Sequence, residues 1–298
     1  PGLDLLSIQN WNKNRCIPNE RDNSTLLCMT MGILGTDELA GKSRAVSLTD
    51  CYWFADENDI SNNIKWEDVN PRNNHLTEDV SKILFDGLVV EAPNIESPDI
   101  ATNGTLPKKW IEADGKYYLI KKDGRHHEVF NEVAASEIAE ALNISHVPYY
   151  FTYLGKEGEE QACICENFIK DDNHEAIDMN CISWSSVVID EKFLRDHGME
   201  QDYGKMKIFA YVVNNADLHL RNISMIRDSN TCEYLQLSPS YDNGDSFHPG
   251  TVYSRSSGNT LREDAMNSIQ YLDKPIDIHE IEDILYYVKA FCLELSEE

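Results

Sequence analysis

The chain has 298 residues, 41% of them hydrophobic and 9% aromatic, which is ordinary for a globular protein large enough for two packed subdomains. Its 52 acidic and 26 basic residues give a formal net charge of −26, which repels nucleic-acid backbones and anionic lipid. We therefore expect no direct binding to nucleic acid or to a membrane. No run of about 18 apolar residues occurs, and the eight cysteines lack zinc-type spacing, so we expect a cytoplasmic protein with reduced thiols.

Residues 1–95 form a first region that shows no grouping of catalytic residue types. Within it, the apolar run 26–34 (LLCMTMGIL) predicts a strand, and residues 76–84 predict a short amphipathic helix. The next segment, 93–107, is rich in Pro, Asn, Gly, Ser and Thr, which is typical of a boundary or loop. We interpret residues 1–95 as an N-terminal accessory region.

The segment that follows is predicted to be rich in strands. Two strand-like runs flank Asp114-Gly115 and predict a β-hairpin. Residues 129–142 (VFNEVAASEIAEAL) carry an apolar stripe at helical spacing, and two further strands are expected at 149–154 and 161–169. The predicted order is therefore hairpin, helix, hairpin.

The remainder of the chain is predicted to be mainly helical. Helices are expected at 205–214 and 280–295, with two short strands between them at 223–226 and 233–237. A β-rich part followed by a helical part is typical of a two-lobed, protein-kinase-like α+β fold. We expect an N-lobe at 96–170 and a C-lobe at 171–298, preceded by the extension 1–95.

The segment 215–222 (NADLHLRN) carries the chemistry that points to a function. In a kinase catalytic loop, an Asp accepts the proton of the attacking hydroxyl, and an Asn five residues later binds Mg²⁺. Asp217 and Asn222 have this spacing, between an apolar helix and a strand. Asp242 follows the next strand-like run and supplies a second oxygen ligand of the type that Mg²⁺ prefers. We predict Asp217 as the base, with Asn222 and Asp242 on the metal.

A kinase also needs a cation for the nucleotide phosphates. Lys121 ends a strand-like run, and a strand lysine of this kind is held by a carboxylate from the following helix. Glu132 is the preferred partner, with Glu137 as the alternative, and Lys122 remains an alternative to Lys121.

Two further segments are expected at the nucleotide. The loop before the lysine contains Thr102, Asn103, Gly104 and Thr105, whose backbone N–H groups and hydroxyls would contact phosphate. The strand end at Glu166, Asn167 and Phe168 is the connection between the predicted lobes, which in a kinase recognises adenine through backbone groups.

With these pieces in order, residues 96–298 resemble the HipA-like serine/threonine kinases, the toxins of bacterial toxin–antitoxin systems. The matching pieces are Leu119-Ile120-Lys121, Asn131-Glu132, Glu166-Asn167-Phe168, residues 217–222 and Tyr241-Asp242. The resemblance implies ATP- and Mg²⁺-dependent phosphorylation of a protein Ser or Thr. It also implies autophosphorylation, with Thr102 and Thr105 as candidate sites, and an antitoxin-like partner, although residues 1–95 do not match the antitoxin-contacting subdomain of larger members.

Two other functions stay open at this stage. Residues 217–222 together with Gly244-Asp245 also resemble the small-molecule phosphotransferases related to aminoglycoside and choline kinases. A nucleotide-binding regulator without catalytic activity is the other alternative, because the expected phosphate loop contains a single glycine.

Overall fold

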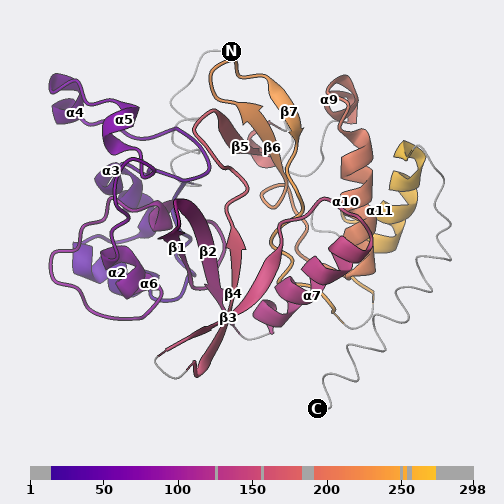
Figure 1. Cartoon of the computed structure of the whole chain (residues 1–298), viewed down its shortest axis with the longest axis horizontal. Coiled ribbons are helices and arrows are strands. Elements are labelled where there is room, and N and C mark those ends of the chain that lie inside the picture. Colours follow the sequence, from indigo (N-terminus) through magenta and orange to yellow (C-terminus); the bar gives the residue numbers. More distant parts are fainter. Residues whose placement is uncertain are drawn as a thin grey trace. The chain divides into compact units, whose positions relative to one another are not determined.

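The computed structural model describes residues 15–124, 127–155, 158–182, 191–248, 251–253 and 257–272. The chain forms two compact units, one from residues 1–124 and 154–172 and the other from residues 125–153 and 173–298, and each is described by itself (Figure 1). The helix expected at 280–295 lies outside the described residues. Among the described helices, none has the length and apolar character needed to cross a membrane.

The first unit combines short helices with three antiparallel strands. Its helices and 3₁₀ turns are α2 (Ser24–Met31), η1 (Thr36–Glu38), α3 (Leu39–Ser43), α4 (Glu57–Ser61), α5 (Trp66–Val69), α6 (Asp79–Leu84) and η2 (Pro98–Ala101). Its strands are β1 (Lys108–Ala113), β2 (Lys116–Lys122) and β4 (Glu160–Glu166), paired in the order β1-β2-β4.

The hairpin predicted around Asp114-Gly115 is confirmed. Both turn residues have positive φ angles, 50° and 71°, as the two-residue turn that matches strand twist requires. The turn pairs Ala113 with Lys116 and so sets the register of β1 against β2. β2 continues the sheet on its other side, where Ile120 lies opposite Ile164 of β4.

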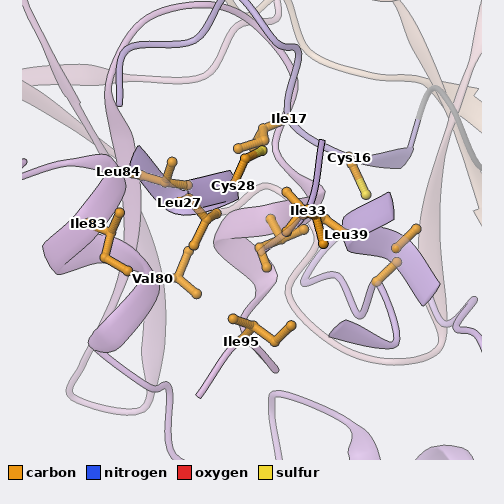
Figure 2. Packing of buried hydrophobic residues seen from close by; sticks show 13 residues of the cluster. Cys16, Ile17, Leu27, Cys28, Ile33, Leu39, Val80, Ile83, Leu84 and Ile95 are labelled. Atoms are coloured by element: carbon orange, nitrogen blue, oxygen red, sulfur yellow. The ribbon is translucent and has the colours of Figure 1, made fainter. Parts of the chain in front are cut away.

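The strand predicted at residues 26–34 is wrong, because residues 26–31 belong to the helix α2 and Gly32 follows its end. Gly32 ends the helix with a φ of 62°, and its N–H donates to the carbonyls of Cys28 and Met29. Leu27 is fully buried while Met29 is 74% exposed, which is the pattern of a helix with one face in the core. Figure 2 shows side chains of α2 together with Val80 and Leu84 of α6 in one apolar cluster.

The second unit is richer in helix. Its helices and 3₁₀ turn are α7 (Glu128–Ala141), α8 (Met179–Ile182), α9 (Glu191–Asp196), α10 (Glu200–Val212), α11 (Leu261–Ser268) and η3 (Ile269–Tyr271). Its strands are β3 (Tyr149–Leu154, whose last residue belongs to the first unit), β5 (His174–Asp178), β6 (Ser224–Asp228) and β7 (Tyr234–Leu237). The last three form an antiparallel sheet in the order β5-β6-β7, and α10 and α11 lie side by side (Figure 1).

The core of the second unit anchors the loop that carries the predicted base. Leu218, Leu220 and Ile223 pack in one buried cluster with Met206 and Ala210 of α10. Leu218 and Leu220 are therefore held in the core, and the polar residues that alternate with them, Asp217 and His219, lie outside this apolar cluster. This arrangement connects the apolar helix before the loop with the strand after it.

The predicted mixture of helices with antiparallel sheets is confirmed. The two-lobed arrangement and the boundaries after residues 95 and 170 stay predictions. Residues 16–95 share the first unit with β1, β2 and β4, and α7 belongs to the second unit.

A buried carboxylate in the first unit makes its stability depend on pH. Asp99 Oδ1 accepts a 2.7 Å hydrogen bond from the Trp110 N–H, and burial raises the pKa of the Asp99 carboxyl from 3.8 to about 6. Because the folded state holds this proton more tightly than the unfolded chain does, the contribution is complete below pH 3.8 and is lost as the pH rises through about 6.

We expect Asp99→Asn, which keeps the acceptor for Trp110, to remove this dependence. The free energy of unfolding of the wild type, relative to the variant, should fall by about 2 kcal/mol between pH 4 and pH 6.5. Urea unfolding of both proteins across this range measures the difference between their free energies of unfolding. The contributions of the other carboxylates are the same in both proteins and cancel in this difference. A difference that stays constant with pH would contradict the prediction.

Candidate active site

Asp217 and Asn222, predicted from their spacing, are brought together at the start and end of one loop. The Asn222 amide Nδ2 donates to the Asp217 carbonyl at 3.0 Å and lies 3.5 Å from the carboxylate Oδ2. Since the amide nitrogen is turned toward Asp217, the amide oxygen of Asn222, which is the atom that a metal would use, points elsewhere. The Asp217 side chain is partly exposed, as a group that meets a substrate must be.

His219 lies on the other side of the same carboxylate. Its Nε2 is 3.7 Å from Asp217 Oδ1, while its buried Nδ1 has no hydrogen-bond partner among the described residues. Sequence reasoning assigned no role to this histidine. The sequence pattern that indicates it is the alternation of His219 with the apolar Leu218 and Leu220, both buried in the structure. This alternation leaves Asp217 and His219 on the same side of the loop.

The segment that contains Asp242 is bonded to this loop through backbone groups. The Ala216 N–H donates to the Asp245 carbonyl at 3.0 Å, and the Phe247 N–H donates to the Val213 carbonyl at 2.7 Å. Asp242 itself has a φ of 59°, a left-handed conformation that Asp tolerates better than most residues. The structure therefore places the segment of the second predicted metal ligand beside the segment of the predicted base.

Helix α7 contacts the same segment with its first turns. The Asn131 amide donates to the Gly244 and Ser246 carbonyls at 2.8 and 3.2 Å. Glu132, only 1% exposed, accepts a 2.8 Å hydrogen bond from the Asn243 N–H. A Cβ on Gly244 would lie 3.2 Å from Glu128 Cβ, so glycine permits this close approach. Asn131, quoted above only as part of the family resemblance, thus joins helix α7 to the segment of Asp242.

The strand lysine predicted at the phosphates lies in the first unit. Lys121 is 2% exposed, and its neighbours Ile120 and Lys122 both contact Phe85, with Lys122 Nζ 4.3 Å from the ring centroid. Because side chains alternate along a strand, Lys121 faces away from Phe85. Lys122 also lies 3.0 Å from Glu160, so the two lysines have separate environments. Pairing of Lys121 with Glu132 stays a prediction.

The predicted phosphate loop is held by an arginine from the accessory region. Arg21 donates to the carbonyls of Thr102, Asn103 and Gly104 at 2.6 to 2.9 Å and to the Thr102 hydroxyl at 2.5 Å. The Thr102 hydroxyl in turn donates to the Asp99 carbonyl. Thr102 is therefore buried, whereas Asn103 and Thr105 are exposed.

In the segment 166–168, the side chains of Glu166 and Asn167 are engaged within the first unit. Glu166 contacts Lys170 and Lys116, and the hydrogen bond from Lys170, with that from Lys116, holds the pKa of this carboxyl below its usual range. The Asn167 amide donates to the Leu48 carbonyl at 2.9 Å, and its N–H donates to the Tyr117 carbonyl. Adenine recognition here would depend on the remaining backbone groups and on Phe168, and it stays a prediction.

Arg72 binds the residues that follow this segment. Its guanidinium donates to the carbonyls of Leu48 and Ile169 at 2.8 and 2.6 Å and pairs with Asp172 at 3.2 Å. Residues 16–95 thus supply one arginine to the predicted phosphate loop and another to the residues that follow 166–168. Sequence reasoning found no role for this region because neither arginine lies in a motif.

The donor set suits a hard divalent cation. Among the described residues, no group of three or more His, Cys, Asp or Glu side chains is placed to hold a metal. An amide oxygen from Asn222 and one carboxylate from Asp242 match Mg²⁺, which typically takes one or two protein carboxylates together with substrate phosphates and water. The residues present therefore fit a metal that arrives with a nucleotide.

No family model matches the chain, and no curated protein matches its sequence. Among solved structures, it is similar to the Helicobacter pylori proinflammatory kinase CtkA, with 15% identity, 61% of this chain and 87% of that chain covered, and a TM-score of 0.44. It is also similar to HipA of the Shewanella oneidensis MR-1 toxin–antitoxin system, solved with HipB and operator DNA. For HipA the identity is 15%, the match covers 63% of this chain and 62% of that chain, and the TM-score is 0.38. The chain thus spans less than two thirds of that HipA, and both likenesses are too distant to assign a family or an activity.

Proposed function

We propose that the chain is an ATP- and Mg²⁺-dependent, HipA-like serine/threonine protein kinase. The observation that carries this proposal is the contact of the Asn222 amide with Asp217, beside the segment that contains Asp242. Carboxylate and amide groups in this order are the parts that phosphoryl transfer requires, since the reaction depends on positioning and charge neutralisation more than on covalent chemistry.

In this proposal the residues of the loop have different roles in phosphoryl transfer. Asp217 accepts the proton of a protein hydroxyl as the hydroxyl oxygen bonds to the γ-phosphorus and the bond to the β–γ bridging oxygen breaks, releasing ADP. Asn222 holds the Asp217 carbonyl and limits the orientation of the carboxylate. Bound Mg²⁺, held by Asn222 and Asp242, would neutralise phosphate charge. Lys121, buried on the strand face away from Phe85, would contact the phosphates in preference to Lys122.

Removing the base should abolish transfer while keeping the fold. We expect Asp217→Asn to lower phosphate transfer by about 10²- to 10⁴-fold, the range associated with general-base catalysis. Phosphate incorporated into the protein or into a generic protein acceptor, measured by mass spectrometry, checks this. Asp228→Asn is the matched control, because it removes the same charge from a carboxylate that accepts hydrogen bonds within its own turn, from the Asn230 and Thr231 N–H groups. Equal activity of the two variants would refute Asp217 as the base.

Nucleotide binding should depend on a divalent metal, because a chain with a net charge of −26 repels free ATP. We expect the affinity for ATP to fall at least about tenfold when Mg²⁺ is replaced by EDTA at constant ionic strength, since uncompensated phosphate charge costs more than 1 kcal/mol. Calorimetric titration measures both affinities. Adenosine, which has no phosphates, should bind equally in both buffers. Equal ATP affinity with and without metal would contradict the metal assignment.

If the protein modifies itself in the phosphate loop, Thr105 is the accessible hydroxyl. Thr102 is 7% exposed, and its hydroxyl already binds Asp99 and Arg21, whereas Thr105 is exposed. We expect phosphate on Thr105 after incubation with ATP and Mg²⁺, and its loss in Thr105→Val. Phosphopeptide mapping distinguishes the two threonines. Modification of Thr102 in the folded protein would show that the loop opens before transfer.

The acceptor distinguishes this proposal from the alternatives. A panel of amino alcohols, aminoglycosides and sugars that stimulates ATP consumption would favour a small-molecule kinase. ATP binding without transfer to any acceptor would favour a regulator.

A further inference from the structure

Two buried asparagines connect the segment of the predicted base with the segment of Asp242. Asn215 Oδ1 accepts a 2.7 Å hydrogen bond from the Asp217 N–H, which forms a turn that fixes the backbone before the carboxylate. The same amide donates through Nδ2 to Asn243 Oδ1 at 3.0 Å. Asn215 is 1% exposed and Asn243 is 5% exposed, so water does not compete for this bond.

The connection continues to helix α7. The Asn243 N–H donates to Glu132 Oε2 at 2.8 Å, and its Nδ2 lies 3.4 Å from Ser240 Oγ. Hydrogen bonds therefore run without interruption from Glu132 through Asn243 and Asn215 to Asp217. Because all the linking groups are buried, breaking one bond leaves an unsatisfied polar atom at a cost of about 1–3 kcal/mol. Directional hydrogen bonds thus fix the distance between the segment that contains Asp217 and the segment that contains Asp242.

We propose that Asn215 and Asn243 are positioning residues that hold Asp217 and Asp242 in a fixed relation and couple both to Glu132. This inference rests on the proposed function for the roles of Asp217 and Asp242. Neither asparagine touches the reacting atoms. They act through the backbone of Asp217 and through the residue next to Asp242, so their loss misplaces the base and a metal ligand together. A catalytic group must be held to within about 0.5 Å, a precision that packing of loops alone seldom supplies.

The chain contains a matched control for Asn215. Asn70 is also 1% exposed, its Oδ1 accepts from the N–H two residues later, in Arg72, and its Nδ2 donates to the distant carboxylate of Asp172 at 2.7 Å. Serine at either position retains a hydroxyl that can accept the local N–H but cannot reach the distant partner. Asn215→Ser and Asn70→Ser therefore each remove one long-range bond of a buried asparagine, one near Asp217 and one in the first unit.

The experiment compares these variants in two measurements. Electron paramagnetic resonance of free Mn²⁺ at a fixed ATP concentration, corrected for the Mn²⁺ that ATP binds without protein, gives the metal affinity of the protein. Phosphate transfer at saturating ATP gives kcat. We expect Asn215→Ser to lower metal affinity or kcat by about 10- to 100-fold, as loss of a supporting residue around a metal ligand does. Asn70→Ser should lower the melting temperature without changing either quantity.

A double substitution tests whether the bond itself matters. If Asn215 and Asn243 act through their shared hydrogen bond, Asn215→Ser with Asn243→Ala should cost no more than the worse single change, because coupled residues are not additive. Additive losses, or an Asn215→Ser protein that behaves like Asn70→Ser, would overturn the inference. A wild type that binds Mn²⁺ with ATP yet transfers no phosphate would refute the kinase proposal, while metal affinity still decides the role of the asparagines. A wild type that binds no metal nucleotide would overturn both.

Discussion

The need to satisfy backbone carbonyls without regular secondary structure governs the first unit. The loop 102–104 and the segment 169–170 form no strand or helix, so their carbonyls need donors from elsewhere. Arg21 and Arg72 supply them, each through several N–H groups of one planar guanidinium. Lysine offers fewer directed donors and could not hold three consecutive carbonyls in this way. The accessory region is therefore part of the framework that holds these two segments, even though it carries no motif.

In the second unit, neutral side-chain amides hold the irregular segments together. The chain has 26 lysines and arginines against 52 aspartates and glutamates, and carboxylates placed close together repel one another. Asn131, Asn215 and Asn243 donate and accept without adding charge near Asp217 and Asp242. The three amides therefore join the segments around the two aspartates without adding to their negative charge.

Local signals in the sequence predicted the elements that local forces determine. The Asp114-Gly115 turn and helix α7 follow from turn chemistry and from periodicity, and both are present. Helix α2 was misread because a short apolar run is consistent with a buried strand or a helix, and only its packing against α6 decides between them. The proximity of Asp217 and Asn222 could be predicted because both residues lie in one loop. Arg21 and Asn215 were missed because their partners lie 81 to 83 and 28 residues away, at separations that no local pattern encodes.

The hydrogen bonds of Asn243 also bear on the chemical ageing of the protein. An asparagine followed by glycine, as in Asn243-Gly244, is prone to deamidation, in which the glycine nitrogen attacks the side-chain carbonyl and ammonia leaves through a cyclic imide. Here the side-chain oxygen is bound by Asn215, and the close packing of Gly244 against Glu128 opposes the backbone rotation that the attack requires. The folded state thus shields a bond that the unfolded chain exposes, and the accumulation of aspartate or isoaspartate at this position would record how often the second unit opens.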